Sequence, residues 1–200
     1  MNEFKINSDF KKYTKIFLEE NSKLNLISKN DEKYLFEKHI YDSLSIGLFF
    51  NKYNIKKAKL LDIGCGGGFP CIPIAIEYPK IDVVGIDSIR KKITAVENIK
   101  NSLGLKNISF ICDRAENLKN KKFDIVTSRA VANLGKILEF AFPLLKKGGF
   151  FVGYKSKKAL SEIENAESII KKYNAKIVDI IEYSLPMEEN YERNLVIITY

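Results

Sequence analysis

The chain has 200 residues, 46% hydrophobic and 29% charged, and this length buries a core without disulfide or metal staples. Its 33 lysines and arginines against 25 acidic residues give a net charge of +8, which indicates either solubility by lysine or a polyanionic partner. No apolar run reaches the length of a bilayer span, and three cysteines with one histidine offer too few ligands at usable spacing for zinc, so the sequence predicts neither a membrane protein nor a metal site.

The first part of the chain, residues 1–59, is predicted to be a helical extension. Apolar residues recur at helical spacing over residues 10–17, which predicts a first helix. A loop is expected at 26–31, and a second helix is expected over 34–51.

Residues 60–200 alternate strands with helices, which predicts a mostly parallel sheet covered by helices on both faces. No helix separates the last two strands, so they are expected to form an antiparallel hairpin at the sheet edge, with a polar turn around Glu188 to Asn190. We therefore expect one domain of the doubly wound α/β class, with the helical extension preceding the sheet. Strands are expected at 60–63, 81–87, 108–112, 123–127, 150–154, 176–182 and 195–199, and helices at 70–77, 90–103, 133–145 and 159–173.

A glycine-rich loop, Asp62-Ile63-Gly64-Cys65-Gly66-Gly67-Gly68, follows the first strand and opens a helix. Glycines let the backbone turn sharply and let a ligand lie against it; a tight turn without a ligand is the alternative. The third glycine of a dinucleotide fingerprint is replaced by Phe69 or Cys71, depending on the register, and no Gly-Lys-Ser/Thr follows. The loop instead resembles that of class I S-adenosylmethionine-dependent methyltransferases, which makes Gly64 and Gly66 candidate cofactor contacts.

Acidic residues follow the next two strands. Asp87 ends the second strand about 20 residues after the glycines, where a carboxylate accepts hydrogen bonds from ribose hydroxyls; capping of the following helix is the alternative. Asp113-Arg114-Ala115-Glu116 follows the third strand. In the methyltransferases that the chain resembles, this loop holds adenine, which implicates Ala115 and Glu116, with a solvated loop as the alternative.

The fourth strand ends in Ser128-Arg129-Ala130-Val131, at the sheet edge where substrates bind in this fold class. This segment differs from the Asn/Asp-Pro-Pro-aromatic motif of adenine amino methyltransferases. No cysteine follows Cys112 to serve carbon-5 methylation of pyrimidines. Guanine N7 needs neither a base nor a covalent intermediate, so alignment alone serves its methylation. Arg129 is expected to orient the cofactor or to donate to guanine O6, with a surface salt bridge as the alternative.

Together these residues resemble the ribosomal RNA small subunit methyltransferase G family, first described as a glucose-inhibited division protein. The resemblance spans nearly the whole chain and includes residues 21–28, Lys38 to Leu44, Asp62 to Pro73, Ser128-Arg129-Ala130 and residues 192–196. It implies methylation of a guanine N7 in 16S ribosomal RNA, with S-adenosylmethionine as cofactor. Carried over by position, the implied cofactor contacts are Gly64, Phe69, Ala115, Glu116 and Arg129.

Two further residues are candidates for the RNA substrate. His39 is by default a packed or capping residue, and the resemblance does not make it a general base. Lys155 is by default solvated, with a phosphate contact as the functional interpretation.

The expected partner is 16S ribosomal RNA or the small ribosomal subunit, and the expected enzyme is a cytoplasmic monomer without membrane or metal, since the first residues lack a secretory pattern. Two alternatives stay open. The same glycine loop and Asp87 serve a methyltransferase of a small molecule or protein equally well. A non-enzymatic RNA-binding module with a vestigial cofactor loop is the other alternative.

Overall fold

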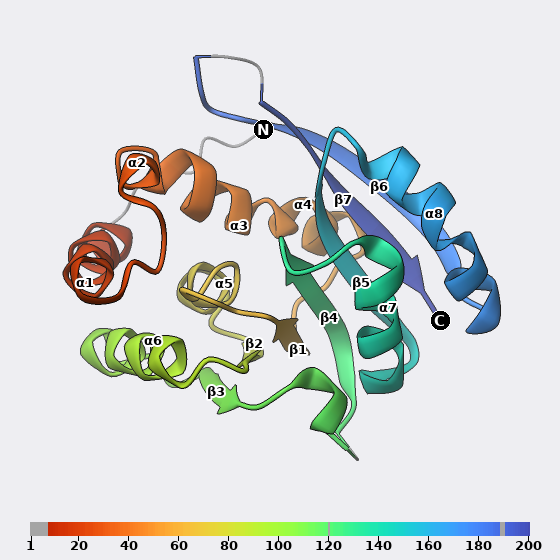
Figure 1. Ribbon diagram of the computed structural model, residues 1–200, viewed down its shortest axis with the longest axis horizontal. Helices are drawn as coiled ribbons and strands as arrows, with labels where there is room; N and C mark the ends of the chain where they lie inside the picture. The colour runs from red at the N-terminus through yellow and green to blue at the C-terminus, as the bar shows by residue number, and fades with distance from the viewer. Residues whose placement is uncertain (1–7, 120, 189–190) are drawn as a thin grey trace.

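The computed structural model describes residues 8–119, 121–188 and 191–200. Its centre is a seven-stranded sheet with the order β3-β2-β1-β4-β5-β7-β6 (Figure 1). The alternation of strands and helices confirms the predicted doubly wound α/β class. The strands are β1 (Ala58–Ile63), β2 (Ile81–Asp87), β3 (Ile108–Cys112), β4 (Phe123–Arg129), β5 (Leu145–Ser156), β6 (Lys176–Leu185) and β7 (Tyr191–Thr199).

The register of the parallel strands brings three strand ends level at one edge of the sheet. Ile63 ends β1 and stands between Ile86 of β2 and Ser128 of β4. The residues that come next therefore leave the sheet side by side at its carboxyl edge. Ligands bind at that edge in open parallel sheets.

The far edge of the sheet is antiparallel, as expected. β7 lies between β5 and β6 and runs antiparallel to both. β6 and β7 are longer than predicted. Their ladder continues to the Leu185–Tyr191 pair, beyond the apolar residues that mark these strands in the sequence. The turn expected around Glu188 to Asn190 falls mainly on residues 189 and 190, which lie outside the described residues.

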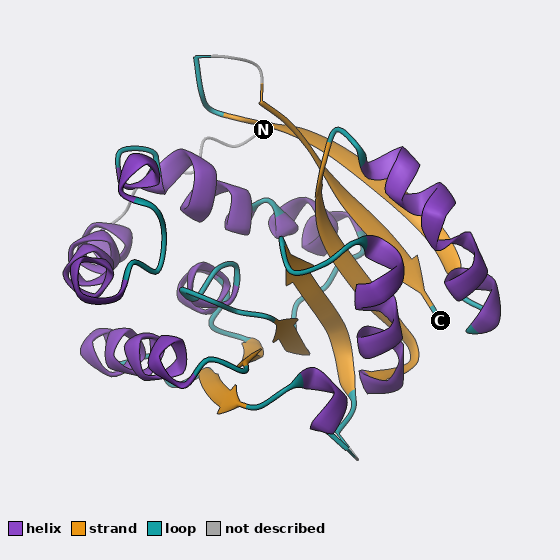
Figure 2. Cartoon of the chain, viewed as in Figure 1, coloured by secondary structure: helices purple, strands orange, loops and turns teal. Residues whose placement is uncertain are grey.

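Helices cover both faces of the sheet, and each face has its own hydrophobic cluster (Figure 2). Leu60 belongs to one cluster and Leu61 to the other, because successive side chains of a strand point to opposite faces. Helices α1, α4, α5 and α6 pack on the first cluster, and α7 and α8 on the second. The helices are α1 (Ser8–Leu24), α2 (Lys29–Glu32), a π-helix (Leu35–Tyr41), α3 (Asp42–Leu44), α4 (Ile46–Lys52), α5 (Cys71–Glu77), α6 (Arg90–Leu103), α7 (Leu134–Ala141), α8 (Ala159–Lys172) and two 3₁₀ turns (Ala115–Asn117 and Phe142–Leu144).

None of the helices within these described ranges combines the length and the apolar character needed to cross a bilayer.

The N-terminal helical segment, residues 8–52, differs from the prediction in two places. The expected loop at 26–31 contains the start of α2, because the Ser28 hydroxyl caps that helix by accepting from the Asp31 N–H at 3.2 Å. The expected second helix is divided into the π-helix, α3 and α4. The Ser43 and Ser45 hydroxyls donate to backbone carbonyls four residues earlier, a local bond that competes with regular helical geometry.

The helix expected over 133–145 is also shorter than predicted. α7 ends at Ala141, and a 3₁₀ turn containing Pro143 follows it. Proline lacks the N–H that an α-helix would need there. β5 consequently begins at Leu145 rather than at residue 150, and it pairs with Phe123 of β4 before a register shift.

Candidate active site

The glycine loop between β1 and α5 lies at the carboxyl edge of the sheet. The N–H groups of Gly64 and Cys65 both donate to the Ile86 carbonyl of β2, at 2.8 and 3.0 Å. Gly64 has φ of +73° and Gly68 has φ of +93°, values that residues with a Cβ rarely adopt. A Cβ at Gly64 would collide with Val131, and one at Gly68 would collide with Ile72. Side chains of the protein itself fill the space beside these two glycines, so the packing of the loop requires glycine at both positions.

Asp87 holds the glycine loop against the end of β2. Its carboxylate accepts from the Gly66 N–H at 3.0 Å and from the Ile89 N–H at 2.9 Å. The N-cap position of α6 is Ile89, so Asp87 is not itself the cap. Each carboxylate oxygen has more than one acceptor position, so both keep capacity for hydroxyl donors of a ligand.

The loop after β3 forms the next part of the edge. The Asp113 carboxylate accepts from the Arg114 N–H and from the Asn117 side chain, both at 2.7 Å. These bonds shape the 3₁₀ turn that carries Ala115, which is buried, and Glu116, which is exposed.

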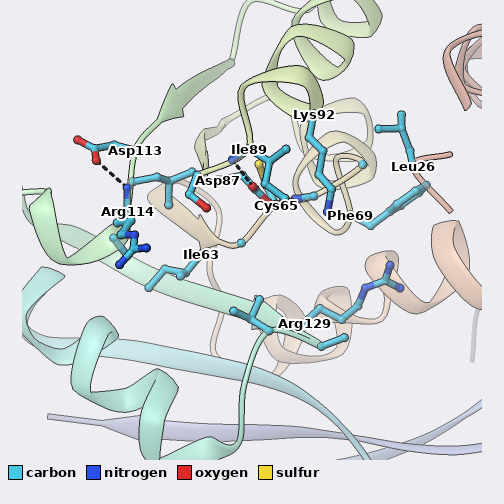
Figure 3. A pocket seen from close by; sticks show the side chains of 18 of the residues that line it. Leu26, Ile63, Cys65, Phe69, Asp87, Ile89, Lys92, Asp113, Arg114 and Arg129 are labelled. Carbon is cyan, nitrogen blue, oxygen red and sulfur yellow. Dashed lines mark hydrogen bonds between the residues drawn. The ribbon is translucent and has the colours of Figure 1, made fainter. Parts of the chain in front are cut away.

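These segments surround one pocket of about 610 Å³ (Figure 3). Residues of β1, the glycine loop, the end of β2, the loop after β3 and Arg129 of β4 line it, and Figure 3 shows how they surround it. Its size suits a nucleoside-type ligand. The expected residues that line this pocket are Gly64, Gly66, Phe69, Asp87, Ala115, Glu116, Arg129 and His39.

Residues of the N-terminal helical segment hold the Arg129 side chain in place. Its guanidinium donates to the Asp42 carboxylate at 2.9 Å and to the Lys38 carbonyl at 3.1 Å. It also lies 5.4 Å from the centre of the Phe69 ring. Asp42 is 1% exposed, so this is a buried ion pair and not the surface salt bridge that the sequence left open.

Three other contacts complete the surroundings of Asp42. Tyr183 donates to its carboxylate at 2.6 Å, and Arg193 donates through Nε and Nη2 at 3.2 Å each. Burial opposes ionisation of Asp42, but the charges of Arg129 and Arg193 and the Tyr183 hydrogen bond outweigh it, so the pKa of this carboxyl is lowered. Asp42 therefore stays ionised and joins four elements of the chain.

His39 lies between Arg129 and Phe69. Its Nδ1 is 3.0 Å from Nη2 of Arg129, and its ring centre is 5.0 Å from that of Phe69. A guanidinium only donates, so Nδ1 is the acceptor and the proton of the neutral ring is on Nε2. Burial, assisted by the charge of Arg129, lowers the pKa of His39 to about 4. The ring is neutral at pH 7, and its acceptor nitrogen is already engaged by Arg129.

Lys155 lies outside the pocket, against the expectation of a phosphate contact. It is 8% exposed, and its ammonium donates to Glu162 at 2.7 Å and to the Ala132 carbonyl at 3.3 Å. These two acceptors compensate the charge of the buried ammonium group within the protein. The solvated default from the sequence is likewise wrong.

Several residues in or beneath the pocket received no role from the sequence. Leu26 and Ile27 of the N-terminal helical segment line the pocket, and the Leu26 side chain packs over Gly67 of the glycine loop. Asp62, beneath the loop, accepts from Thr127 at 3.1 Å, and burial raises its pKa to about 8 despite that bond. Val131 also lines the pocket. Leu26, Ile27, Asp42 and Asp62 belong to the stretches 21–28, 38–44 and 62–73 that supported the family resemblance, but the sequence assigned none of them a role of its own.

No cluster of three or more His, Cys, Asp or Glu side chains suited to a metal ion occurs in the described part of the chain.

The chain is similar to known proteins over nearly its whole length. The model of the family rRNA small subunit methyltransferase G matches residues 6–196. A ribosomal RNA small subunit methyltransferase G from Listeria monocytogenes is 39% identical over 197 residues, covering 95% of this chain and 81% of the relative. One from Staphylococcus saprophyticus is 38% identical over 193 residues, covering 94% and 80%.

Solved structures support the fold. An S-adenosylmethionine-dependent methyltransferase from Clostridium acetobutylicum has a TM-score of 0.62 at 19% identity, covering 85% of this chain and 98% of that one. TYW2 from M. jannaschii, in complex with AdoMet, has a TM-score of 0.57 at 21% identity, covering 72% and 68%. The fold is that of class I methyltransferases.

Proposed function

The chain belongs to the rRNA small subunit methyltransferase G family, and from that membership we propose that it transfers a methyl group to N7 of a guanine in 16S ribosomal RNA. It is an enzyme that uses S-adenosylmethionine. When bound, this cofactor supplies an electrophilic methyl group on a sulfonium.

The observation that supports this proposal best is the pocket at the carboxyl edge, which the glycine loop, Asp87, Arg129 and His39 line together. Gly64 and Gly66 line the pocket with bare backbone, and Asp87 offers acceptor positions to ribose hydroxyls. Ala115 and Glu116 border the adenine end. Phe69 and Arg129 border the opposite end, where we place the reacting methyl group.

The residues at the Phe69 and Arg129 end of the pocket suit methylation of guanine N7. The lone pair of N7 forms the new N–C bond while the C–S bond breaks, the sulfur keeps the electron pair, and the positive charge passes to the guanine. No proton leaves, so no base is needed. Arg129 and the neutral His39 are unsuited to take a proton, because the first is a permanent cation and the second has its acceptor nitrogen engaged. What these residues supply is orientation.

An RNA substrate also accords with the net charge of +8 and with Lys92 and Arg114, which line the pocket. Phosphate contacts release counterions, so RNA binding should weaken steeply as salt rises. A methyltransferase of a small molecule would show no such slope.

The test is methyl transfer from labelled S-adenosylmethionine to small ribosomal subunits that lack the modification, followed by separation of RNA from protein. Label in the RNA supports the proposal. Label in protein, or transfer only to small molecules, would favour the alternative methyltransferase, and absence of cofactor binding would favour the non-enzymatic RNA-binding module.

We also propose that the enzyme acts in the cytoplasm as a monomer, with residues 1–59 and 60–200 working as one domain. Packing of Phe17 on Phe69, with ring centres 5.0 Å apart, supports the single domain. Sedimentation equilibrium at the mass of one chain, and a single unfolding transition, are the expected results.

A further inference from the structure

The loop after β4 places an apolar side chain at the pocket in an unusual way. Ala130 has φ of +56°, a conformation that residues with a Cβ rarely adopt. Val131, which follows, lines the pocket and is 44% exposed. Its two methyl groups pack on Gly64 of the glycine loop. Single exposed valines are ordinary, but a disfavoured backbone persists only where its surroundings impose it.

A partly buried ion pair holds the backbone that follows Val131. The Lys155 ammonium donates to the Ala132 carbonyl at 3.3 Å, and the Glu162 carboxylate accepts from the Leu134 N–H at 3.1 Å. The two side chains bind each other at 2.7 Å. The pair therefore holds the loop by one carbonyl and one amide, on the C-terminal side of Val131. Nothing in the methyl transfer itself uses this pair.

We propose that Val131 is the residue against which the target base lies, and that Lys155 and Glu162 are positioning residues that fix its loop. The inference rests on the proposed function and adds to it the surface that orients the guanine.

The chemistry of the base explains the apolar side chain. An enzyme that modifies a base takes it out of the stack and holds it against apolar or aromatic surface. Guanine N7 is an acceptor, and a donor side chain at this place would hydrogen-bond the lone pair that must attack. A valine gives the ring a contact surface and leaves N7 free.

The variants Val131→Ala and Val131→Thr separate contact from polarity. Alanine removes the two methyl groups, while threonine keeps the size of the side chain and adds a hydroxyl. The matched control is Val178→Ala on β6, where the valine is 42% exposed and lies away from the pocket. For each protein, kcat and KM are measured with the RNA substrate, and Kd for S-adenosylmethionine is measured by calorimetry.

We expect both Val131 variants to lose about tenfold in kcat/KM for RNA, with Kd for the cofactor within about twofold of the wild type. The control should match the wild type in all three. If Kd for the cofactor changes as much as kcat/KM, Val131 contacts the cofactor and the inference is wrong. Unchanged kcat/KM in both Val131 variants also overturns it.

The ion pair is tested by a double-mutant cycle with Lys155→Met. If Lys155 acts by positioning Val131, then Lys155→Met lowers kcat/KM in the wild-type background but has little further effect when Val131 is already alanine. Its effect on thermal stability should be the same in both backgrounds. Equal losses of kcat/KM in both backgrounds would mean that the pair is merely structural.

Failure of this inference and failure of the proposed function give different results. If the wild type does not methylate guanine N7, the proposed function fails. If the wild type does so and the Val131 variants behave like Val178→Ala, only the inference fails.

Discussion

Arg129 at the end of β4 and Asp42 at the start of α3 form a buried ion pair at 2.9 Å, although they are 87 residues apart in the sequence. The pair couples the N-terminal helical segment to the pocket. Arg193 and Tyr183 bind the same carboxylate, so groups of the protein itself compensate its negative charge.

Asp42→Asn should therefore destabilise the protein strongly. Loss of the negative charge leaves two arginines without compensation, and breaking a buried pair on one side costs about 3–5 kcal/mol. Chemical denaturation measures this cost, and methyl transfer should fall because Arg129 is no longer fixed. Glu167→Gln is the matched control, because its partner Lys171 and Glu167 itself are largely exposed. Equal effects of the two substitutions would contradict the role assigned to Asp42.

His39 should make stability depend on pH. Its pKa is about 4 in the folded protein and 6.5 when unfolded, so between these values the unfolded chain binds a proton that the folded chain does not. The contribution is fully present above pH 6.5 and is lost as pH falls toward 4, up to about 3 kcal/mol in total.

His39→Gln keeps an acceptor for Arg129 and removes this titration. Measured from pH 7.5 to 4, the wild type should therefore lose up to about 3 kcal/mol of its free energy of unfolding relative to the variant as the pH falls. A difference that stays constant over this range would show that His39 titrates normally in the folded protein.

Gly64→Ala should damage cofactor binding more than an equally strained glycine elsewhere. Gly64 and Gly104 have nearly the same φ, +73° and +71°, but a Cβ at Gly104 meets nothing within 4 Å while one at Gly64 collides with Val131. Both variants pay about 1–2 kcal/mol for the left-handed backbone. Only Gly64→Ala should also raise Kd for S-adenosylmethionine, by about tenfold or more. Similar Kd values in the two variants would remove Gly64 from the cofactor site.

Asp87→Ala should weaken cofactor binding by about 1–3 kcal/mol, through lost hydrogen bonds to a charged acceptor. The substitution also frees the Gly66 N–H, so part of the loss comes from the loop. Asp87→Asn, which keeps one acceptor oxygen, should lie between the alanine variant and the wild type. Calorimetry with S-adenosylmethionine measures all three, and an affinity unchanged in Asp87→Ala would exclude the residue from the site.

The local parts of the site were predictable from the sequence. The glycine loop, Asp87 and the 113–116 loop each lie within a few residues of a strand end, and parallel strands bring such ends to one edge. The alternation of strands and helices was enough to place them there.

The remaining parts depend on contacts between distant segments. Nothing in the sequence near Asp42 indicates that Tyr183 and Arg193 will reach it, and Leu26 reaches the pocket only because α1 packs on the glycine-loop side of the sheet. Lys155 was misjudged for a related reason: its partner Glu162 lies one turn into the next helix, a spacing that many solvated lysines share.

The most direct test of the central claim is nucleoside mass spectrometry of 16S ribosomal RNA after reaction of unmodified small subunits with the purified enzyme and S-adenosylmethionine. We expect one new 7-methylguanosine per RNA with the wild type, and a lower yield when Asp87→Ala replaces it at limiting cofactor. A methyl group on another atom of guanine, or on another base, would contradict it.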